Sequence, residues 1–513
     1  MISAENGALP GGKVGGIGDV VRELPTALAK RNNTVSVLTP GYGIFGNLSG
    51  AQLLQQLTVR FAGRTESLEL YFLDGMSRDR KIRHYAIDHP LFSSAGIGKI
   101  YCDDPPSRPF ESDASKFALF CTAVAEALRN AAFGDIGAVH LHDWHAAFLL
   151  ILRRYDPVYR SLQALRCVYS IHNLAIQGIR PFVGQESSLD AWFPDLVYPR
   201  QQLADPRWAD CVNPMAAAIR LADAVNTVSP SYAEEILSPS DARRGYYGGE
   251  GLEHDLQQAK DEHRLFGILN GCEYPRKKKP VLPDWSALRQ AMHQQVLVWA
   301  SQQPLVANAH FIANQSIAQL KHDRPPMVIT SVGRITDQKV GLMRQTTASG
   351  QPALHAVLDA MGEAATFLMI GSGDTDSEQF LIETSARYSN FVFLRGYSEA
   401  LGNAFYEQGD LFFMPSSFEP CGISQMLALR SGQPCLVHAV GGLRDTIDDN
   451  KTGFVFTGSN PTEQADALVA TLQRALTLYQ TKPAQWKTMR KSAAAARFKW
   501  ADSIDAYLEQ LYQ

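Results

Sequence analysis

Short runs of β-branched and aromatic residues recur along the chain, and most are followed by a segment with apolar residues at helical spacing. This alternation is typical of parallel α/β layers and not of a β-sandwich. In the first half, helices are predicted over 19–30 and 116–132. The strands are predicted over 34–40, 138–144, 167–173 and 223–230 in the first half, and over 327–334, 366–373, 391–397, 410–416 and 434–440 in the second.

The pattern predicts an α/β protein with two Rossmann-like halves, each a doubly wound parallel sheet. We expect an N-terminal domain over 1–275, a linker over 276–326, a C-terminal domain over 327–500, and a helix over 501–513 that crosses back to the first half. Few residues precede the glycine-rich loop that begins at Gly11, although a parallel strand normally takes about five residues. We therefore expect the first strand to be truncated.

Composition and charge exclude several structural and functional classes. The chain has 45% hydrophobic and 19% charged residues, which rules out disorder, collagen and coiled coil. Its 48 basic and 52 acidic residues give a formal charge of -4, so no global field favours nucleic acid or anionic lipid. The seven cysteines form no CxxC motif, which suits a reducing compartment without disulfides or structural zinc. With no apolar run of membrane-spanning length and no leader pattern, we expect a soluble, cytoplasmic protein without a membrane partner.

The loop GGKVGGIGDV, from Gly11 to Val20, places glycines and one lysine, Lys13, before a helix. Glycines let a backbone approach a ligand closely, and a helix start offers free N–H groups with partial positive charge. The loop matches neither the dinucleotide-binding motif GxGxxG nor the NTP-hydrolase motif GxxxxGK[ST]. Both of these functions are therefore disfavoured. By itself the loop is either a phosphate site or a structural turn.

Two segments, HLHDWHAA from His140 and SIHNLAIQG from Ser170, place polar residues at the carboxyl ends of apolar strands, the edge where open α/β sheets bind ligands. Three histidines near Asp143 raise the question of a metal, but hydrogen bonding to a hydroxyl-rich substrate or within the loop is the favoured interpretation, and no metal is predicted. His172 alone is equally consistent with a structural imidazole.

The second half carries cations and a carboxylate. Arg334 and Lys339 follow the strand MVITSV, where two fixed cations suit a leaving diphosphate in the absence of a metal. In PSSFEPCGISQ, Glu419 follows another strand, and the next residues open a helix. Such a carboxylate could accept sugar hydroxyls while the helix amides hold phosphate.

These motifs, with NTVSPSYAEEI, GILNG, GSGD, RGY and GGLRDT, occur in the order of the bacterial glycogen synthase and plant starch synthase family, which the chain resembles over nearly its whole length. The resemblance implies a GT-B fold, with two Rossmann-like domains facing a central cleft. It also implies transfer of glucose from ADP-glucose to the non-reducing O4 end of an α-1,4-glucan such as glycogen, with retention of configuration and without a cofactor.

The resemblance implies catalytic roles for five residues: Lys13, His172, Arg334, Lys339 and Glu419. Lys13 would contact donor phosphate and glucose, His172 would bond the glucose, and Glu419 would orient its hydroxyls. The residues implied in substrate binding are Gly15, Gly16, Asp143, Asn173, Asn270, Gln338, Gly371, Tyr397, Cys421, Gly422, Ile423 and Ser424; Tyr397 is where the family stacks adenine.

The chain departs from the family pattern at Ala216, at Cys272 with Glu273, and around Val340. We expect these departures to affect primer preference and rate more than the reaction type. Two alternatives remain: another GT-B glucosyltransferase that uses UDP-glucose, and a non-catalytic glucan-binding regulatory protein derived from a synthase.

Overall fold

The computed structural model describes residues 1–274, 281–302 and 307–513. The chain divides into two compact units. Unit 1 comprises residues 1–239, 248–271 and 499–513, and unit 2 comprises residues 240–247 and 272–498. The chain therefore passes from one unit to the other four times, and its last residues belong to unit 1.

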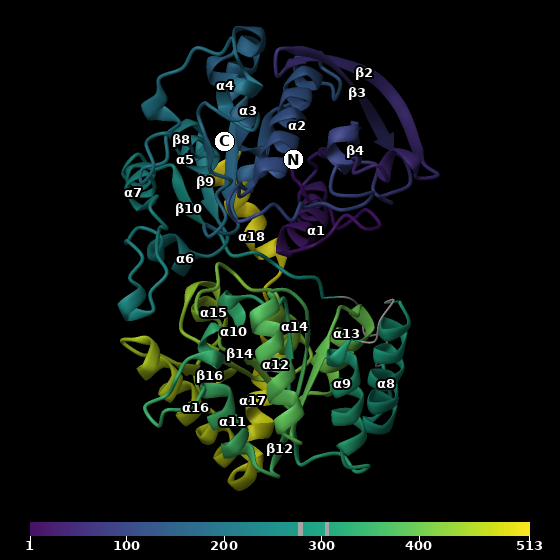
Figure 1. Cartoon of the computed structure of the whole chain (residues 1–513), viewed down its shortest axis with the longest axis vertical. Coiled ribbons are helices and arrows are strands. Elements are labelled where there is room, and N and C mark those ends of the chain that lie inside the picture. The colour runs from purple at the N-terminus through teal and green to yellow at the C-terminus, as the bar shows by residue number, and fades with distance from the viewer. Residues whose placement is uncertain (275–280, 303–306) are drawn as a thin grey trace. The chain divides into compact units, whose positions relative to one another are not determined.

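Unit 1 contains two four-stranded sheets and their covering helices in the described part of the chain (Figure 1). The strands are β1 (Val35–Pro40), β2 (Ala51–Phe61), β3 (Arg64–Leu73), β4 (Ile82–Asp88), β5 (Ala138–His142), β6 (Arg166–Ile171), β7 (Arg180–Pro181), β8 (Cys211–Val212), β9 (Ala224–Thr227) and β10 (Leu265–Gly267). The helices are α1 (Gly16–Lys30), α2 (Glu111–Arg129), α3 (Asp143–Tyr155), α4 (Leu189–Trp192), α5 (Pro214–Leu221), α6 (Pro230–Glu235), α7 (Glu253–Asp261) and α18 (Trp500–Ala506), which runs into a π-helical turn (Tyr507–Leu511).

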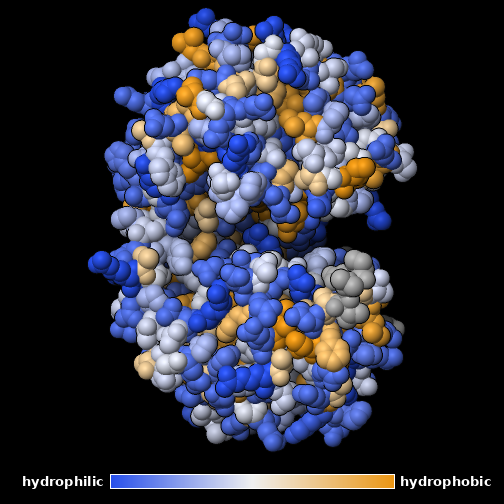
Figure 2. Space-filling model, in the orientation of Figure 1, coloured by the Kyte–Doolittle hydropathy of each residue, from blue (hydrophilic) through white to orange (hydrophobic). Residues whose placement is uncertain are grey.

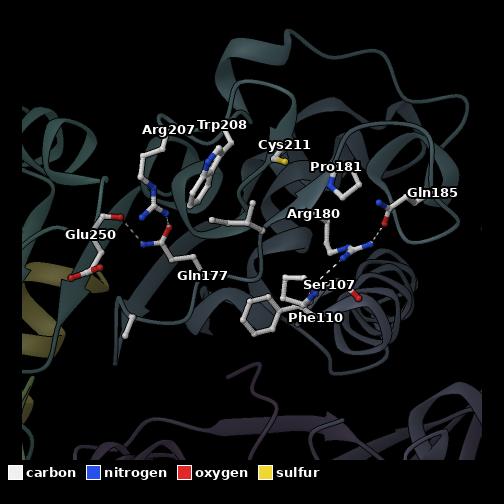
Figure 3. Close-up of a pocket in the computed structure, with 13 residues that line it drawn as sticks. Ser107, Phe110, Gln177, Arg180, Pro181, Gln185, Arg207, Trp208, Cys211 and Glu250 are labelled. Atoms are coloured by element: carbon white, nitrogen blue, oxygen red, sulfur yellow. Dashed lines mark hydrogen bonds between the residues drawn. The ribbon is translucent and has the colours of Figure 1, made fainter. Parts of the chain in front are cut away.

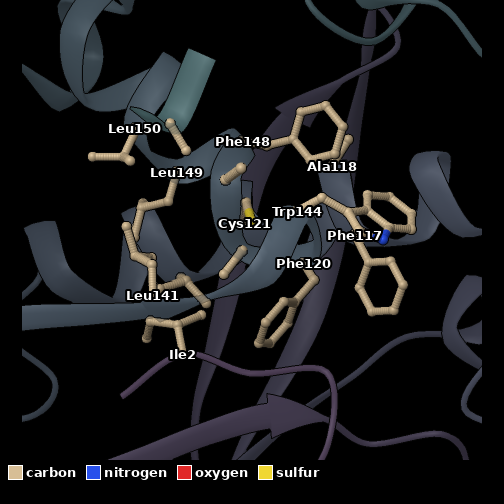
Figure 4. Close-up of a cluster of buried hydrophobic side chains, with 14 of the residues drawn as sticks. Ile2, Phe117, Ala118, Phe120, Cys121, Leu141, Trp144, Phe148, Leu149 and Leu150 are labelled. Carbon is tan, nitrogen blue, oxygen red and sulfur yellow. The ribbon is translucent and has the colours of Figure 1, made fainter. Parts of the chain in front are cut away.

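The two four-stranded sheets of unit 1 have the strand orders β1-β4-β3-β2 and β10-β9-β6-β5, and β7 and β8 form a separate two-stranded sheet. Ile2 joins the two four-stranded sheets, because it forms parallel bridges to Leu38 of β1 and to Leu141 of β5. Its side chain lies beside Leu141 in the core (Figure 4). The segment at Ile2 thus takes the place of a strand at the centre of the sheet, directly before the glycine-rich loop.

Unit 2 contains one fully parallel six-stranded sheet in the order β13-β12-β11-β14-β15-β16. Its strands are β11 (Met327–Val332), β12 (Ala365–Gly371), β13 (Phe391–Arg395), β14 (Leu411–Met414), β15 (Cys435–His438) and β16 (Gly453–Phe456). Its helices are α8 (Trp285–Ser301), α9 (Asn308–Gln319), α10 (Asp337–Arg344), α11 (Ala353–Met361), α12 (Thr375–Arg387), α13 (Glu399–Gln408), α14 (Ser424–Arg430), α15 (Gly441–Thr446), α16 (Pro461–Thr481) and α17 (Pro483–Ala495).

This strand order is that of a doubly wound Rossmann sheet, and it reverses between β11 and β14. Ligands of such sheets bind at the carboxyl ends of the strands where the order reverses. The segments with Arg334 and Glu419 follow β11 and β14 directly. The topology therefore brings the two predicted segments of unit 2 to the same edge.

All nine predicted strands are present, and the two predicted helices shift by a few residues, to α1 and α2. Two features differ from the predictions. In unit 1, β3 runs antiparallel to both β2 and β4, so that part of the sheet is not parallel. The predicted linker, 276–326, instead carries α8 and α9, whose apolar residues pack in the core of unit 2 against β11, β12 and β13. Residues 275–280 and 303–306 of that stretch lie outside the described residues.

Hydrophilic residues cover most of the face drawn in Figure 2, and the apolar residues there are scattered. In the described residues, no helix is both long and apolar enough to span a bilayer.

Candidate active site

The Lys13 loop of unit 1 is held by a buried carboxylate that the sequence analysis missed. Glu5 is 2% exposed and accepts hydrogen bonds from the backbone N–H groups of Val14 at 2.8 Å and Gly15 at 2.7 Å. It also accepts the Tyr101 hydroxyl at 2.9 Å. A carboxylate at a helix start is favourable because the free N–H groups there carry partial positive charge. The amide of Gly15, a residue implied in substrate binding, therefore donates to Glu5 in this structure, and a phosphate that bound this amide would have to displace Glu5.

Lys13 itself lies at the surface of the loop. Its Nζ contacts the carboxylate of Asp19 at 2.6 Å, and Arg22 contacts the same carboxylate at 3.0 Å. The Lys13 side chain is 36% exposed. Gly18 lies under the loop, where an added Cβ would be 2.9 Å from Cγ of Lys13 and 3.1 Å from Glu5. The loop conformation thus depends on a glycine in the first turn of α1.

The carboxyl ends of β5 and β6 bring Asp143 and His172 together. Asp143 begins α3 with a positive φ of 54°, and its Oδ1 accepts the backbone N–H of His172 at 2.6 Å. Burial raises the pKa of Asp143 to about 7 and lowers the pKa of His172 to about 4. The carboxyl group that holds the backbone of His172 therefore has a pKa near neutrality, and the His172 ring is neutral at pH 7.

Two other predicted residues of unit 1 have different surroundings. Asn173 is half-buried, and its Oδ1 accepts the backbone N–H of Ala175 at 2.9 Å. Asn270 follows β10 and is 3% exposed, and its Oδ1 has no hydrogen-bond partner among the described residues. A buried amide oxygen without a donor is uncommon in proteins. It is consistent with a site that a ligand hydroxyl completes.

In unit 2, Lys339 and Glu419 form an ion pair between the first turn of α10 and the segment after β14. Glu419 is 6% exposed, and its Oε2 also accepts the hydroxyl of Ser416 at 3.0 Å. Gln338 supports the segment, since its Nε2 donates to the carbonyl of Phe418 at 3.0 Å. The structure therefore brings the predicted cation and carboxylate into direct contact.

Arg334 is exposed after β11 and has no ion pair among the described residues. Because Arg334 is exposed, its guanidinium is available to an anion. Tyr397, at the end of β13, is 74% exposed. An exposed tyrosine ring at this edge offers a stacking surface.

The segment from Cys421 to Ser424 forms a tight turn before α14. Gly422 has φ +76°, a conformation that favours glycine. The Gln425 side chain donates to the carbonyls of Cys421 at 3.0 Å and Gly422 at 2.9 Å. The amides of this turn and of the start of α14 are therefore held in a fixed arrangement, as the sequence predicted for a helix start. Gly371 has different surroundings. A Cβ at this position would lie 2.0 Å from the carbonyl oxygen of Gly333, so close packing also explains why a glycine is present there.

Unit 1 also contains a pocket of about 500 Å³ that the sequence analysis did not predict (Figure 3). Its walls combine apolar side chains with arginines, glutamines and a glutamate. It is lined by Ser107, Pro109, Phe110, Ala175, Gln177, Ile179, Arg180, Pro181, Gln185, Arg207, Trp208, Cys211 and Glu250. These residues come from four separate stretches of the chain, so no local motif could have indicated the pocket.

The predicted site residues thus form two groups, one in each unit. The unit 1 group contains Lys13, Gly15, Gly16, Asp143, His172, Asn173 and Asn270, and the unit 2 group contains Arg334, Gln338, Lys339, Gly371, Tyr397, Glu419, Cys421, Gly422, Ile423 and Ser424.

Comparison with known proteins shows which class of protein has this fold and these motifs. A family model described as the starch synthase catalytic domain matches residues 1–258, and one described as glycosyl transferases group 1 matches residues 326–474. Glycogen synthase from Streptococcus equi subsp. equi is 30% identical over 524 residues, covering 99% of this chain and 98% of the relative. Glycogen synthase from Desulfitobacterium hafniense is 30% identical over 516 residues, covering 98% and 96%.

The fold agrees with a solved structure, the catalytic domain of starch synthase IV from Arabidopsis thaliana bound to ADP and acarbose. The TM-score is 0.75 at 23% sequence identity, covering 99% of this chain and 97% of that chain. The fold and the family models define a glycosyltransferase of the GT-B fold, which confirms the predicted fold class. The chain belongs to the starch synthase catalytic domain family, and it is a glycosyltransferase of the glycogen and starch synthase type.

Proposed function

We propose that the chain transfers glucose from ADP-glucose to the non-reducing O4 end of an α-1,4-glucan, with retention of configuration. The observation that supports this most directly is the ion pair of Lys339 and Glu419, with the exposed Arg334 between β11 and α10, at the point where the strand order of unit 2 reverses. Two cations suit a diphosphate, and a buried carboxylate suits sugar hydroxyls. The ADP and acarbose bound by the starch synthase IV domain are consistent with this donor and acceptor.

In this proposal Arg334 and Lys339 bind the diphosphate and neutralise charge as ADP leaves. The turn from Cys421 to Ser424 adds backbone amides, and Tyr397 stacks on the adenine. Glu419 accepts glucose hydroxyls and stabilises the positive charge that develops at the anomeric carbon. Such preorganised groups each lower a barrier by about 3 kcal/mol.

The unit 1 group supplies the acceptor side and part of the donor contacts. Lys13, with the amides of Gly15 and Gly16, contacts donor phosphate and glucose. His172 bonds the transferred glucose. Asp143, Asn173 and Asn270 line the site of the sugar or acceptor. There the Oδ1 of Asn270, which has no hydrogen-bond partner among the described residues, accepts a hydroxyl.

Transfer is a front-face displacement. The bond between C1 and the diphosphate oxygen breaks, and the bond between C1 and the acceptor O4 forms on the same face of the glucose ring. The proton of O4 passes to a phosphate oxygen of the departing ADP. The chain therefore needs no enzymic nucleophile, and its cations and its carboxylate act on charge that develops in the transition state.

The test is a coupled assay of ADP or UDP release from ADP-glucose or UDP-glucose, with glycogen as acceptor and a reaction without glycogen as the control for hydrolysis. We expect faster release from ADP-glucose, dependent on glycogen. A preference for UDP-glucose would contradict the donor assignment, and no release from either donor would favour the non-catalytic alternative. Retention is checked by the anomeric proton signals of the elongated glucan, which we expect to show α-linkages only.

A further inference from the structure

The carboxylate of Glu419 is bound unevenly, because both of its side-chain partners contact the same oxygen. Oε2 accepts the hydroxyl of Ser416 at 3.0 Å and pairs with Nζ of Lys339. A carboxylate oxygen has about two acceptor sites, so these two donors occupy Oε2 fully. Side chains of unit 2 therefore fix the orientation of this carboxyl group.

The second oxygen of Glu419, Oε1, is left without a protein donor. It has no hydrogen-bond partner in the described part of the chain, and it is not among the atoms there that are both buried and unpartnered. Solvent therefore reaches Oε1, although the side chain as a whole is only 8% exposed. An acceptor without a donor, at the open side of a nearly buried carboxylate, is the atom that a ligand hydroxyl can reach.

Lys339 has donors beyond those used by its ion pair. An ammonium group has three N–H donors, and within the residues that the structure describes only the one directed at Glu419 has a partner. The Lys339 side chain is 21% exposed. Its other two donors are therefore available to an anion, so Lys339 can link Oε2 of Glu419 to a bound diphosphate.

The serine that donates to Oε2 is itself held by two neighbouring strands. Ser416 follows β14 and is 0% exposed. Its carbonyl accepts Nδ1 of His438 in β15 at 3.2 Å. Burial lowers the pKa of His438 to about 4, so the ring is neutral at pH 7. That ring stacks on Phe456 of β16 with centroids 4.9 Å apart, and Ser416 is thus fixed in the sheet.

The backbone on both sides of Glu419 is anchored as well. The N–H of Ser417 donates to the carbonyl of Gln338 at 2.8 Å, and Nε2 of Gln338 donates to the carbonyl of Phe418 at 3.0 Å. The carbonyl of Glu419 accepts the N–H of Gly442 at 3.0 Å. The main chain needs no help from a serine hydroxyl, whose hydrogen bond acts on the carboxyl group at the end of the side chain.

A buried serine does not need a carboxylate partner. Most side-chain hydrogen bonds in proteins go to the backbone or to water. Ser316 in α9 is an example from the same unit: it is 3% exposed, and its hydroxyl donates to the carbonyl of Ser385 at 3.2 Å. The hydroxyl of Ser416 instead donates to the predicted catalytic carboxylate.

We propose that Glu419 contacts the transferred glucose through Oε1, and that Ser416 is a positioning residue that holds the carboxyl group in this orientation. The role in transfer rests on the proposed function. Oε1 accepts a glucose hydroxyl and acts on the positive charge that develops at the anomeric carbon. Oε2 stays bound to Lys339 and, through it, to the diphosphate. A carboxyl group that could rotate would lose part of this preorganisation.

The first test compares Ser416→Ala with wild type in the assay of ADP release. We expect kcat to fall about tenfold, the loss of one hydrogen bond to a charged group. The KM for ADP-glucose and the affinity for ADP should stay within twofold, because Lys339 still binds the diphosphate. Ser316→Ala is the matched control, which removes a buried hydroxyl elsewhere in unit 2 and should keep the kcat of wild type. Circular dichroism checks that each variant is folded.

A double-mutant cycle separates positioning from an effect on the fold. In the Glu419→Gln background the charge is already absent, so Ser416→Ala should change kcat by less than twofold. A serine that only stabilised the fold would lower kcat by the same factor in both backgrounds. That result, or a kcat of Ser416→Ala within twofold of wild type, would overturn the proposal.

Urea unfolding of the same four proteins tests the contact without any turnover. A hydrogen bond to a charged group is about twice as strong as one between neutral groups. Ser416→Ala should therefore lower the urea midpoint more in wild type than in Glu419→Gln, and equal losses would overturn the assigned orientation. If the midpoints differed as expected but wild type transferred no glucose, the proposed function would fail while the fixed carboxyl group would stand.

A crystal structure of wild type with ADP-glucose identifies the contacting oxygen directly. We expect a glucose hydroxyl within about 3 Å of Oε1 of Glu419, with Oε2 still on Ser416 and Lys339. A glucose hydroxyl bound to Oε2 in place of Ser416 would overturn the proposal.

Discussion

At the scale of single residues, Lys339 and Glu419 depend on each other. Glu419 is buried, and a buried carboxylate is costly unless it is paired and hydrogen-bonded. Lys339 and the Ser416 hydroxyl meet that requirement. Removing the charge of either residue therefore has one effect on the reaction and another on the fold, and the two can be separated.

Glu419→Gln keeps the size and hydrogen bonding of the side chain but removes its charge. We expect the rate of transfer to fall about 100-fold, because the carboxylate acts mainly on charge in the transition state. Affinity for ADP should change little, since ADP lacks the glucose. Steady-state kinetics measures the rate of transfer, and calorimetry measures the affinity for ADP. Glu363→Gln is the control, because that side chain is 90% exposed. Near-normal turnover of Glu419→Gln would rule out the role.

Lys339→Ala should weaken ADP-glucose and ADP alike, about tenfold, because the lysine contacts the diphosphate common to both. It should also lower the free energy of unfolding by about 1 to 3 kcal/mol, since Glu419 loses its partner. Adding Glu419→Gln should restore the stability but not the affinity. Titration calorimetry and urea unfolding report these effects, and Lys451→Ala removes an exposed ion pair as the control. Unchanged ADP affinity would show that the lysine has no role in binding.

At the scale of elements, the strands predicted from the sequence are correct because strands covered on both faces read as continuous apolar runs. The antiparallel strands β2 and β3 were missed because many of their residues are polar and exposed. Helices α8 and α9 were assigned to a linker because their buried residues are few and spaced among polar ones. Polar residues at the strand ends could be predicted as site residues from their position, and their roles remain predictions. Glu5 and the pocket with Trp208 were not, because their contacts come from distant parts of the chain.

The start of α1 provides a test of the Lys13 loop as an element. Gly18→Ala places a Cβ 2.9 Å from Cγ of Lys13, so we expect the lysine stem to shift and the KM for ADP-glucose to rise several-fold. Helix propensity favours alanine by about 1 kcal/mol, so stability should not fall through the helix itself. Gly137→Ala is the control, because a Cβ there meets nothing within 4 Å. An unchanged KM with a normal melting temperature would show that the position of Lys13 does not matter for the donor.

At the scale of the whole molecule, unit 1 is completed by the last residues of the chain. Trp500, Ile504, Tyr507 and Leu511 pack with residues of α1 and β1 in one apolar cluster. The indole N–H of Trp500 donates to Glu23 at 2.9 Å. Unit 1 can therefore complete its core only after all of unit 2 has been synthesised, so the order of folding does not follow the order of the chain.

Buried histidines in both units make the stability of the molecule depend on pH. His84 of unit 1 and His438 of unit 2 are 3% and 4% exposed, and burial lowers the pKa of each to about 4. Both stay neutral in the folded state at pH values where the unfolded chain, with a pKa near 6.5, binds a proton. Each histidine therefore contributes on the order of 3 kcal/mol to the free energy of unfolding. This contribution is complete above about pH 6.5 and is lost as the pH falls toward 4. Asp143 acts in the opposite direction: its pKa of about 7 favours the folded state at low pH, and that contribution is lost as the pH rises from about 4 to 7.

The stability of unit 2 isolates one of these histidines. Nδ1 of His438 donates to the carbonyl of Ser416 at 3.2 Å, and His438→Asn keeps a donor near that position but cannot titrate. We expect urea unfolding of this variant to lose less stability between pH 6.5 and 4 than wild type, because one proton fewer binds to the unfolded chain over that range. His254→Asn, at an exposed position of α7, should leave the pH dependence as in wild type. If His438→Asn and wild type lost stability equally as the pH fell, protonation of His438 would not contribute to acid unfolding.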